Sequence, residues 1–312
     1  MPLDPQVQAL LAQMAEQGLP PFEEMSVPEA RDVMNGFRDL QGEPEPVGEV
    51  RDVLATGPAG LLPVRVYHPS PGTELPLMVY FHGGGWVIGN VEVLDKPCRA
   101  LANAARCVVA SVEYRLSPET RYPGPAEDAH AATRWLAAHA AELGADRERL
   151  IVAGDSAGGN LAAVTALMSR DRGGPRIAYQ LLLFPVTAPA RNTTFASYSE
   201  NADGYMLTRG AMEWFWDLYV SSPEQATEPY ASPLHATDLS DLPPAMVTTA
   251  EFDPLRDEGR AYAQRLEDAG VAVTSTGYGG VVHDFILMGG VIDRARVLFA
   301  DVGEQIHKRF GT

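Results

Sequence analysis

Short runs of β-branched and other apolar residues alternate with longer Ala- and Leu-rich segments from about residue 46 onward. This alternation is typical of strands joined by helices in a mostly parallel α/β sheet. Eight strands are predicted, at Gly48–Ala55, Leu61–His68, Leu75–Phe81, Cys107–Glu113, Arg149–Gly154, Tyr179–Phe184, Ala245–Ala250 and Val271–Tyr278. Turn-forming residues separate the first two strands, so we expect an antiparallel pair at one edge of the sheet.

Residues 1–45 and 188–225 do not follow this alternation. In the first region, apolar side chains recur at helical spacing, as at Val7 and Leu10, and the second region concentrates aromatic residues in Trp214–Tyr219. Two interpretations remain: these helices pack onto the core as ordinary structure, or they form a lid over the ligand-binding edge of the sheet. We favour the lid, because aromatic and methionine side chains suit the wall of an apolar pocket.

Composition narrows the class of protein. A length of 312 residues with 46% hydrophobic content predicts one α/β domain with an elaboration, or two domains. The net charge of −17 argues against nucleic acid or anionic membranes as partners, because surfaces of like charge repel. No secretion signal or membrane span is recognisable, so we expect a soluble, cytoplasmic protein. Cys98 and Cys107 lack metal-ligand spacing, so two buried free thiols and no metal are expected.

The segment GDSAGG, residues 154–159, lies between a short apolar strand and an Ala-rich helix predicted to start near Gly158 or Gly159. A G-x-S-x-G motif in this strand-turn-helix context predicts a nucleophilic serine, Ser156, on a sharp turn. Glycines two residues to either side, Gly154 and Gly158, suit a turn where a Cβ would clash with neighbouring elements. The free N–H groups at the start of the helix suit a developing oxyanion.

A serine needs a base to remove its proton, and the sequence offers seven histidines. We expect His283, in the segment GGVVHDF, because it follows the last predicted strand and precedes the final helix. The orienting acid should come after the serine and before the histidine, on the loop after the penultimate strand. Asp253 in TTAEFDPLRDEG meets this condition better than its neighbours Glu251, Asp257 and Glu258. Asp155 and Asp284 adjoin the serine and the histidine directly, and we expect them to be structural.

The segment YFHGGGW, residues 80–86, continues the strand Leu75–Phe81 with consecutive glycines. Such a loop lets backbone N–H groups approach an oxygen atom closely. A phosphate cradle is the competing interpretation, and it is disfavoured because no G-K-[ST] follows. As an oxyanion hole, the loop would act together with the N–H of Ala157.

Taken together, these motifs resemble the hormone-sensitive lipase family of α/β-hydrolases, the bacterial family IV esterases. The resemblance covers residues 75–290 through HGGGW, VEYRLSPE, PAEDA, GDSAGGNLA, DPLRDEG and HDF, in the order of the family. It implies an eight-stranded, mostly parallel sheet with helices on both faces. It also implies a helical cap, formed by residues 1–45 and 188–225, on a catalytic domain of residues 46–187 and 226–312.

The resemblance also assigns roles to residues. It implies Ser156 as nucleophile, Asp253 as orienting acid and His283 as base, without metal or cofactor. The backbone amides of Gly84, Gly85 and Ala157 would form the oxyanion hole, and Gly83 is a further candidate donor. His82, Tyr114 and Arg115 would support the site. Two positions depart from the family pattern: Asp284 stands where glycine is common, and Glu113 where aspartate is usual. The first departure would alter the pKa of the base.

The expected function is hydrolysis of short- to medium-chain carboxylic esters through an acyl-enzyme. Two alternatives stay open at this point. An amide or N-acetyl hydrolase would use the same residues, and a non-catalytic ligand-binding protein would keep the pocket without turnover. The expected partner is a small-molecule ester, and the resemblance leaves a homodimer through the last strand and helix open.

Overall fold

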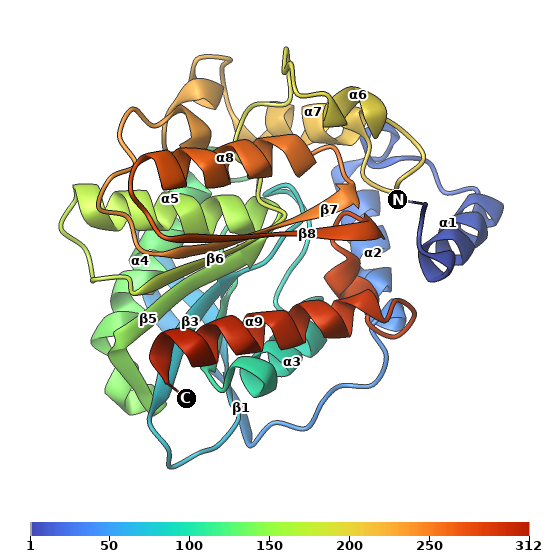
Figure 1. Ribbon diagram of the computed structural model, residues 1–312. Helices are drawn as coiled ribbons and strands as arrows, with labels where there is room; N and C mark the ends of the chain where they lie inside the picture. Colours follow the sequence, from blue (N-terminus) through green and yellow to red (C-terminus); the bar gives the residue numbers. More distant parts are fainter. Residues whose placement is uncertain (1, 312) are drawn as a thin grey trace.

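Figure 1 shows the computed structural model, which describes residues 2–311. One sheet has the order β1-β2-β4-β3-β5-β6-β7-β8. The strands are β1 (Glu49–Gly57), β2 (Gly60–His68), β3 (Leu75–Phe81), β4 (Val108–Val112), β5 (Ala145–Asp155), β6 (Tyr179–Leu183), β7 (Ala245–Phe252) and β8 (Val273–Val282). β2 is antiparallel to β1 and β4, and all other neighbours are parallel. The predicted mostly parallel eight-stranded sheet and its antiparallel edge pair are confirmed.

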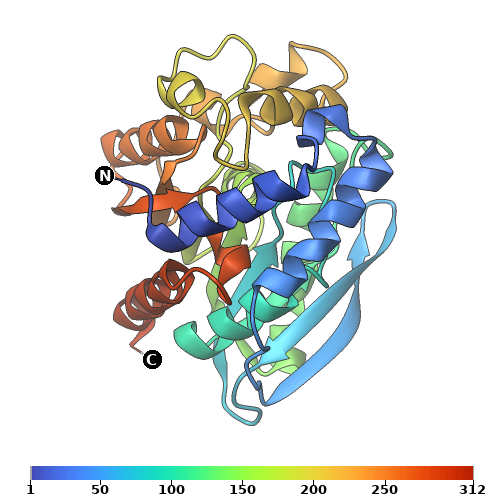
Figure 2. The same cartoon turned by 90° about the vertical axis from the view of Figure 1, so that its right-hand side faces the viewer.

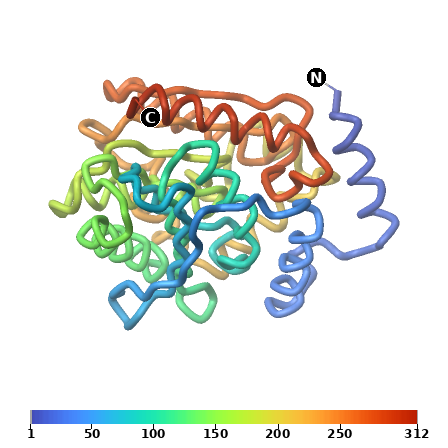
Figure 3. Tube along the Cα trace, turned by 90° about the horizontal axis from the view of Figure 1, so that it is seen from below, coloured from blue at the N-terminus to red at the C-terminus, as the bar shows by residue number. Residues whose placement is uncertain are grey.

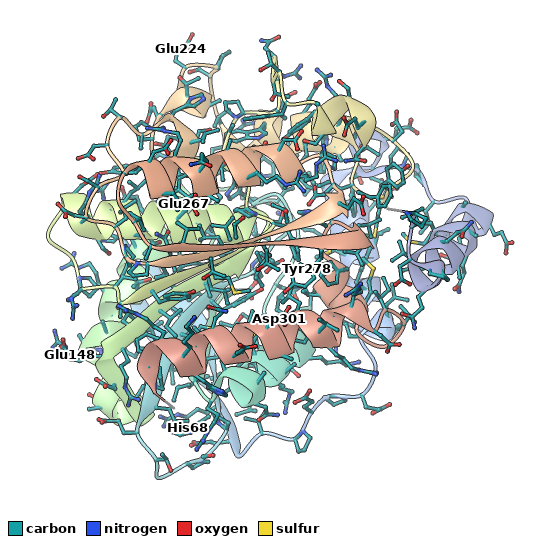
Figure 4. All side chains as sticks on the ribbon, in the orientation of Figure 1. His68, Glu148, Glu224, Glu267, Tyr278 and Asp301 are labelled. Carbon is teal, nitrogen blue, oxygen red and sulfur yellow. The ribbon has the colours of Figure 1, made fainter. Side chains whose placement is uncertain are left out.

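Helices cover both faces of the sheet, as predicted (Figure 1). One face carries α4 (Gly124–Ala138), α5 (Ala157–Asp171) and α8 (Arg256–Asp268), and the other carries α3 (Asp95–Ala105) and α9 (Arg294–Phe310). Every residue of β3 and β4 is buried, because a central parallel strand is covered on both sides. Near the sheet edge, the Tyr278 hydroxyl of β8 donates a hydrogen bond of 2.7 Å to Asp301 of α9 (Figure 4).

β3 has the predicted bounds, most other strand ends shift by one or two residues, and β5 and β8 each shift by four residues at one end. β5 begins at Ala145 rather than Arg149, because Ala145 and Asp146 pair with the first two residues of β3 ahead of a register irregularity. β8 continues to Val282 rather than ending at Tyr278, because β7 pairs with it as far as Val282. The extension of β8 places His283 directly at the end of a strand, which fixes the position of its backbone.

The two regions outside the alternation form no strand within residues 2–45 or within the β6–β7 connection, residues 184–244. The N-terminal region contains α1 (Pro5–Gln17), η1 (Phe22–Glu24), α2 (Val27–Gly36) and η2 (Phe37–Leu40), and the connection contains α6 (Ser197–Glu200), α7 (Arg209–Tyr219), η4 (Gln225–Thr227) and η5 (Pro233–His235). α1 and α2 lie together on one side of the molecule (Figures 2 and 3). The Thr208 hydroxyl donates to Glu23 at 2.7 Å, which joins the two regions.

The two cysteines are buried free thiols, as expected. No helix in the described part of the chain, residues 2–311, is both long enough and apolar enough to cross a membrane. Within the same residues, no group of three or more His, Cys, Asp or Glu side chains could hold a metal ion.

Candidate active site

Ser156 occupies the turn between β5 and α5, and α5 begins at Ala157, one residue earlier than predicted. Its backbone has φ 53° and ψ −118°, a conformation that a non-glycine residue adopts only when its surroundings impose it. A Cβ on Gly158 would collide with the carbonyl of Phe81, and one on Gly154 would collide with Gly158. The two glycines thus allow the turn to approach β3 and α5 closely, as the sequence predicts.

The structure brings Ser156, His283 and Asp253 together, although the serine and the histidine are 127 positions apart. His283 Nε2 lies 2.9 Å from Ser156 Oγ, and His283 Nδ1 lies 2.7 Å from Asp253 Oδ2. Because the carboxylate accepts at Nδ1, the imidazole carries its proton there and presents an acceptor nitrogen to the serine. The Leu255 amide donates a hydrogen bond of 2.8 Å to the other carboxylate oxygen, Asp253 Oδ1.

The three acidic neighbours of Asp253, which are not predicted to orient the base, make other contacts. Glu251 accepts from the Gly280 amide, and Asp257 accepts from the Ser197 amide. Glu258 is fully buried and accepts at 2.6 Å from the Thr187 amide and at 2.9 Å from the Tyr198 hydroxyl. Burial raises the pKa of Glu258 to about 8, although these hydrogen bonds lower it.

The histidines that sequence reasoning set aside lie elsewhere. His68 is the last residue of β2 (Figure 4). His235 lies in η5, and His307 lies in α9. His130 and His139 belong to α4 and its C-terminal end. His82 is fully buried beneath the glycine loop.

The glycine loop leaves β3 beside the serine. Gly84 and Gly85 have positive φ values of 106° and 57°, and both border the same cavity as Ser156. Ala157 is the first residue of α5, and the first N–H groups of a helix have no carbonyl partner within it. The Gly83 amide instead donates 3.0 Å to Asp155 Oδ2, so it is already engaged. Gly84, Gly85 and Ala157 therefore fit the predicted oxyanion hole better than Gly83.

His82 and Tyr114 hold this loop from below. Their rings stack with centroids 4.3 Å apart and planes 15° from parallel. The Tyr114 hydroxyl donates a hydrogen bond of 2.8 Å to the His82 carbonyl. His82 Nδ1 donates a hydrogen bond of 2.8 Å to the Gly83 carbonyl. Burial lowers the pKa of His82, so the ring stays neutral and acts as a hydrogen-bonding support.

Asp155 lies below the same loop and is fully buried. Its carboxylate accepts 2.7 Å from the Tyr80 hydroxyl in addition to the Gly83 amide. Burial raises its pKa to about 6, and the two hydrogen bonds oppose this rise. These contacts fit the structural part expected for Asp155, since its carboxylate ties the glycine loop to the serine turn.

The charge of His283 is set by opposing effects. Burial lowers its pKa, but the carboxylates of Asp253 and Asp284 outweigh burial and raise the pKa to about 9. Asp284 Oδ2 lies 3.4 Å from His283 Nε2, on the side of the ring that faces the serine. Asp284 is thus placed to influence the base, as expected from its departure from glycine.

A small cavity of about 50 Å³ opens at Ser156. Its lining is apolar except for the serine, the histidine and Asp284, and it comes from five parts of the chain. The lining side chains from the N-terminal region and the β6–β7 connection are Phe22, Met34, Phe37, Met206, Leu207, Met212 and Phe215. Sequence reasoning expected an apolar pocket wall from both regions, but no motif marks these individual positions.

Sequence reasoning also missed the contacts that hold the loop carrying Asp253. Asn201 Nδ2 donates a hydrogen bond of 3.1 Å to the Asp253 carbonyl. The Ser197 hydroxyl donates a hydrogen bond of 2.6 Å to the Pro254 carbonyl. Both side chains are buried and belong to the β6–β7 connection. Ser197 and Asn201 belong to no recognisable sequence motif, so their contacts with the loop of Asp253 are visible only in the folded chain.

Comparisons with known proteins identify similar chains with the alpha/beta hydrolase fold and esterase activity. A family model described as alpha/beta hydrolase fold matches residues 78–287. The carboxylesterase NlhH of Mycobacterium tuberculosis is 42% identical over 266 residues, which cover 83% of this chain and 83% of NlhH. An ethyl acetate hydrolase of Pseudomonas putida is 40% identical over 260 residues, covering 81% of this chain and 80% of that protein. The solved structure of a hyperthermophilic esterase from Pyrobaculum calidifontis is 42% identical, covers 99% of both chains and superposes with a TM-score of 0.94.

Proposed function

This chain belongs to the hormone-sensitive lipase family (family IV) of α/β-hydrolases, and from this premise we propose that Ser156, His283 and Asp253 hydrolyse carboxylic esters. The observation that carries the proposal is the continuous hydrogen-bonded line from Ser156 Oγ through both nitrogens of His283 to Asp253. Membership alone assigns carboxylic ester hydrolysis, and this geometry supports the assignment of roles to residues.

In the first half of the reaction, Ser156 Oγ attacks the ester carbonyl carbon while His283 Nε2 takes the hydroxyl proton. The carbonyl oxygen becomes an oxyanion, which the N–H groups of Gly84, Gly85 and Ala157 bind. Each such donor typically lowers the barrier by about 3–4 kcal/mol. The intermediate then collapses: the C–O bond to the alcohol breaks, and Nε2 gives its proton to the leaving oxygen.

In the second half, water attacks the acyl-enzyme and passes one proton to His283 Nε2. Collapse of the second intermediate returns that proton to Ser156 Oγ and releases the carboxylic acid. Asp253 holds the imidazole in the correct tautomer and stabilises the imidazolium formed in both halves. No step changes the protonation of Asp253 itself.

The N-terminal region and residues 188–225 of the β6–β7 connection act as the cap. Support comes from their shared lining of the pocket and from the hydrogen bond between Thr208 and Glu23. The small, apolar cavity at Ser156 supports a preference for short- to medium-chain esters. The ethyl acetate hydrolase among the relatives supports the same short- to medium-chain preference. The two buried free thiols suit a reducing, cytoplasmic setting.

The test is hydrolysis of p-nitrophenyl esters from acetate to palmitate by the wild type and by Ser156→Ala. We expect rates that peak at short chains and a variant that retains at most a few per cent of wild-type turnover. Matched p-nitroanilides measure the amidase alternative on the same acyl groups. Retained turnover in a folded Ser156→Ala protein would exclude the proposed nucleophile, and faster anilide than ester cleavage would move the assignment to amides.

A further inference from the structure

Asp284 is a buried carboxylate that faces the substrate pocket. It is 7% exposed and lines the cavity together with Ser156 and His283. Its Oδ2 lies 3.4 Å from His283 Nε2, and its Oδ1, also buried, has no hydrogen-bond partner among residues 2–311. A buried polar atom without a partner costs about 1–3 kcal/mol, so an acceptor at this position requires an explanation.

The local backbone does not explain the carboxylate. Asp284 has φ 49°, a left-handed conformation that glycine and asparagine adopt equally well. Its side chain makes no capping hydrogen bond to the short helix η6 (Phe285–Met288) that follows. Burial raises the pKa of Asp284, and the neighbouring His283 opposes this rise. The remaining role for Oδ1 is to accept a hydrogen bond from a ligand.

The position of Asp284 indicates which part of the ligand would reach it. In ester hydrolysis the base returns its proton to the leaving alcohol, so the alcohol oxygen lies next to His283 Nε2. Asp284 Oδ2 lies 3.4 Å from that nitrogen, and its carboxylate therefore borders the alcohol part of the ester. The other side chains that line the cavity, such as Met34, Phe37 and Leu287, offer no competing polar group.

We propose that Asp284 is a specificity residue that accepts a hydrogen bond from a hydroxyl or ammonium group on the second carbon of the alcohol. The preferred substrates are monoesters of 1,2-diols and of amino alcohols, rather than simple alkyl esters. This inference rests on the proposed ester hydrolysis and specifies its substrate class. An alkyl ester of equal size leaves Oδ1 unpaired, and a site built to hydrogen-bond its substrate discriminates strongly against an analogue that lacks the group.

Two pairs of butanoate esters test this with a common acyl-enzyme. 2-Hydroxyethyl and propyl butanoate differ by a hydroxyl in place of a methyl group. 2-(Dimethylamino)ethyl and 3-methylbutyl butanoate differ by a protonated nitrogen in place of a carbon, and the tertiary amine cannot capture the acyl group. Because the second half of the reaction is the same for all four esters, ratios of kcat/KM report only the alcohol part.

The variants are Asp284→Gly and Asp284→Asn, both compatible with the left-handed backbone. We expect wild-type ratios of about tenfold or more in favour of each polar ester, and a loss of about tenfold in both ratios for Asp284→Gly. Asp284→Asn should keep much of the hydroxyl preference, because its amide oxygen still accepts, and lose the ammonium preference with the charge. Asp32→Asn, an exposed aspartate on α2, is the matched control and should leave both ratios at the wild-type value.

Wild-type ratios within about twofold of one would overturn the inference, and so would an Asp284→Gly variant that keeps the wild-type ratios. A uniform change in the rates of all four esters would likewise overturn it, because it would mean that Asp284 acts only through His283. The proposed function fails in a different way, namely if the wild type hydrolyses none of the four esters faster than Ser156→Ala. The two failures are therefore distinguishable in the same set of assays.

Discussion

His283 lies between two carboxylates that have different consequences for its chemistry. Asp253 contacts Nδ1 at 2.7 Å, the nitrogen that keeps its proton throughout the reaction. Asp284 lies 3.4 Å from Nε2, the nitrogen that must be free of a proton to accept one from Ser156. Both negative charges favour the imidazolium, and together they outweigh burial to raise the pKa to about 9. The charge that orients the base therefore also restricts the pH range in which it acts.

The pH profile follows from this value. Because only neutral His283 can take the serine proton, kcat/KM for p-nitrophenyl butanoate should rise with pH toward a midpoint near 9. Asp284→Asn removes one negative charge and should move the midpoint to lower pH. Asp32→Asn removes an exposed charge on α2 and should not move it. A midpoint that is the same in Asp284→Asn and wild type would show that Asp284 does not raise the pKa of the base.

Two nearby aspartates test the assignment of the acid: Asp253 lies in the loop after β7, and Asp257 lies in the first turn of α8. Asp253→Asn preserves the shape of the side chain but presents the wrong tautomer of His283 to the serine, which in a comparable protease triad costs about 10⁴ in kcat. Asp257→Asn, four positions later, alters a group that accepts from the Ser197 amide, and we expect a loss of less than about tenfold. Single-turnover rates on p-nitrophenyl butanoate measure both. Equal losses in the two variants would contradict the assignment.

At the scale of elements, the site depends on close approach between β3, β5 and α5. The serine turn and the glycine loop are linked by the carboxylate of Asp155, which accepts from Tyr80 and from the Gly83 amide. The backbones meet where Gly158 passes the carbonyl of Phe81. The β6–β7 connection reaches the same edge through Asn201 and the Asp253 carbonyl.

Two glycine substitutions should have opposite effects on stability. Gly158→Ala places a Cβ against the Phe81 carbonyl, which cannot yield without moving β3, and overpacking of this kind costs about 1–3 kcal/mol or more. Gly36→Ala, within α2, meets nothing within 4 Å and should be neutral or stabilising by up to about 1 kcal/mol. Urea unfolding of the two variants and the wild type measures both. A Gly158→Ala protein as stable as the wild type would contradict the close contact.

For the whole molecule, the buried acids link stability to pH. Burial raises the pKa of Glu258 to about 8, of Asp284 to about 7 and of Asp155 to about 6, all above the values near 4 of unfolded carboxyl groups. The folded state therefore keeps protons that the unfolded state has lost. His283, with a pKa raised to about 9 in the folded state, acts in the same direction at higher pH.

Stability should consequently fall as activity rises. Burial lowers the pKa values of His68, His82 and His130, and these histidines oppose the trend below about pH 7. Between about pH 7 and 9 the folded state binds more protons than the unfolded state, so the free energy of unfolding decreases as pH increases. Urea unfolding at a series of pH values measures this slope. Glu258→Gln removes one of the titrating groups and should flatten the part of the slope below about pH 8. A slope that is flat in the wild type, or unchanged in the variant, would contradict the assignment of the buried protons.

The parts of this protein that depend on local spacing can be predicted from the sequence. The strands, the turn around Ser156 and the glycine loop are each specified by a few neighbouring residues. The order of Ser156, Asp253 and His283 along the chain then suffices to expect their meeting, because the carboxyl ends of parallel strands converge at one edge of a sheet.

The other features could not be predicted from the sequence, because they depend on contacts between residues far apart in the chain. That the Gly83 amide is engaged follows from Asp155 lying beneath it at 3.0 Å. The extra length of β8 follows from its pairing with β7, and the pocket wall combines two regions that no motif connects. The unpaired oxygen of Asp284 is likewise invisible in a sequence, since whether a carboxylate finds a partner depends on every element packed around it.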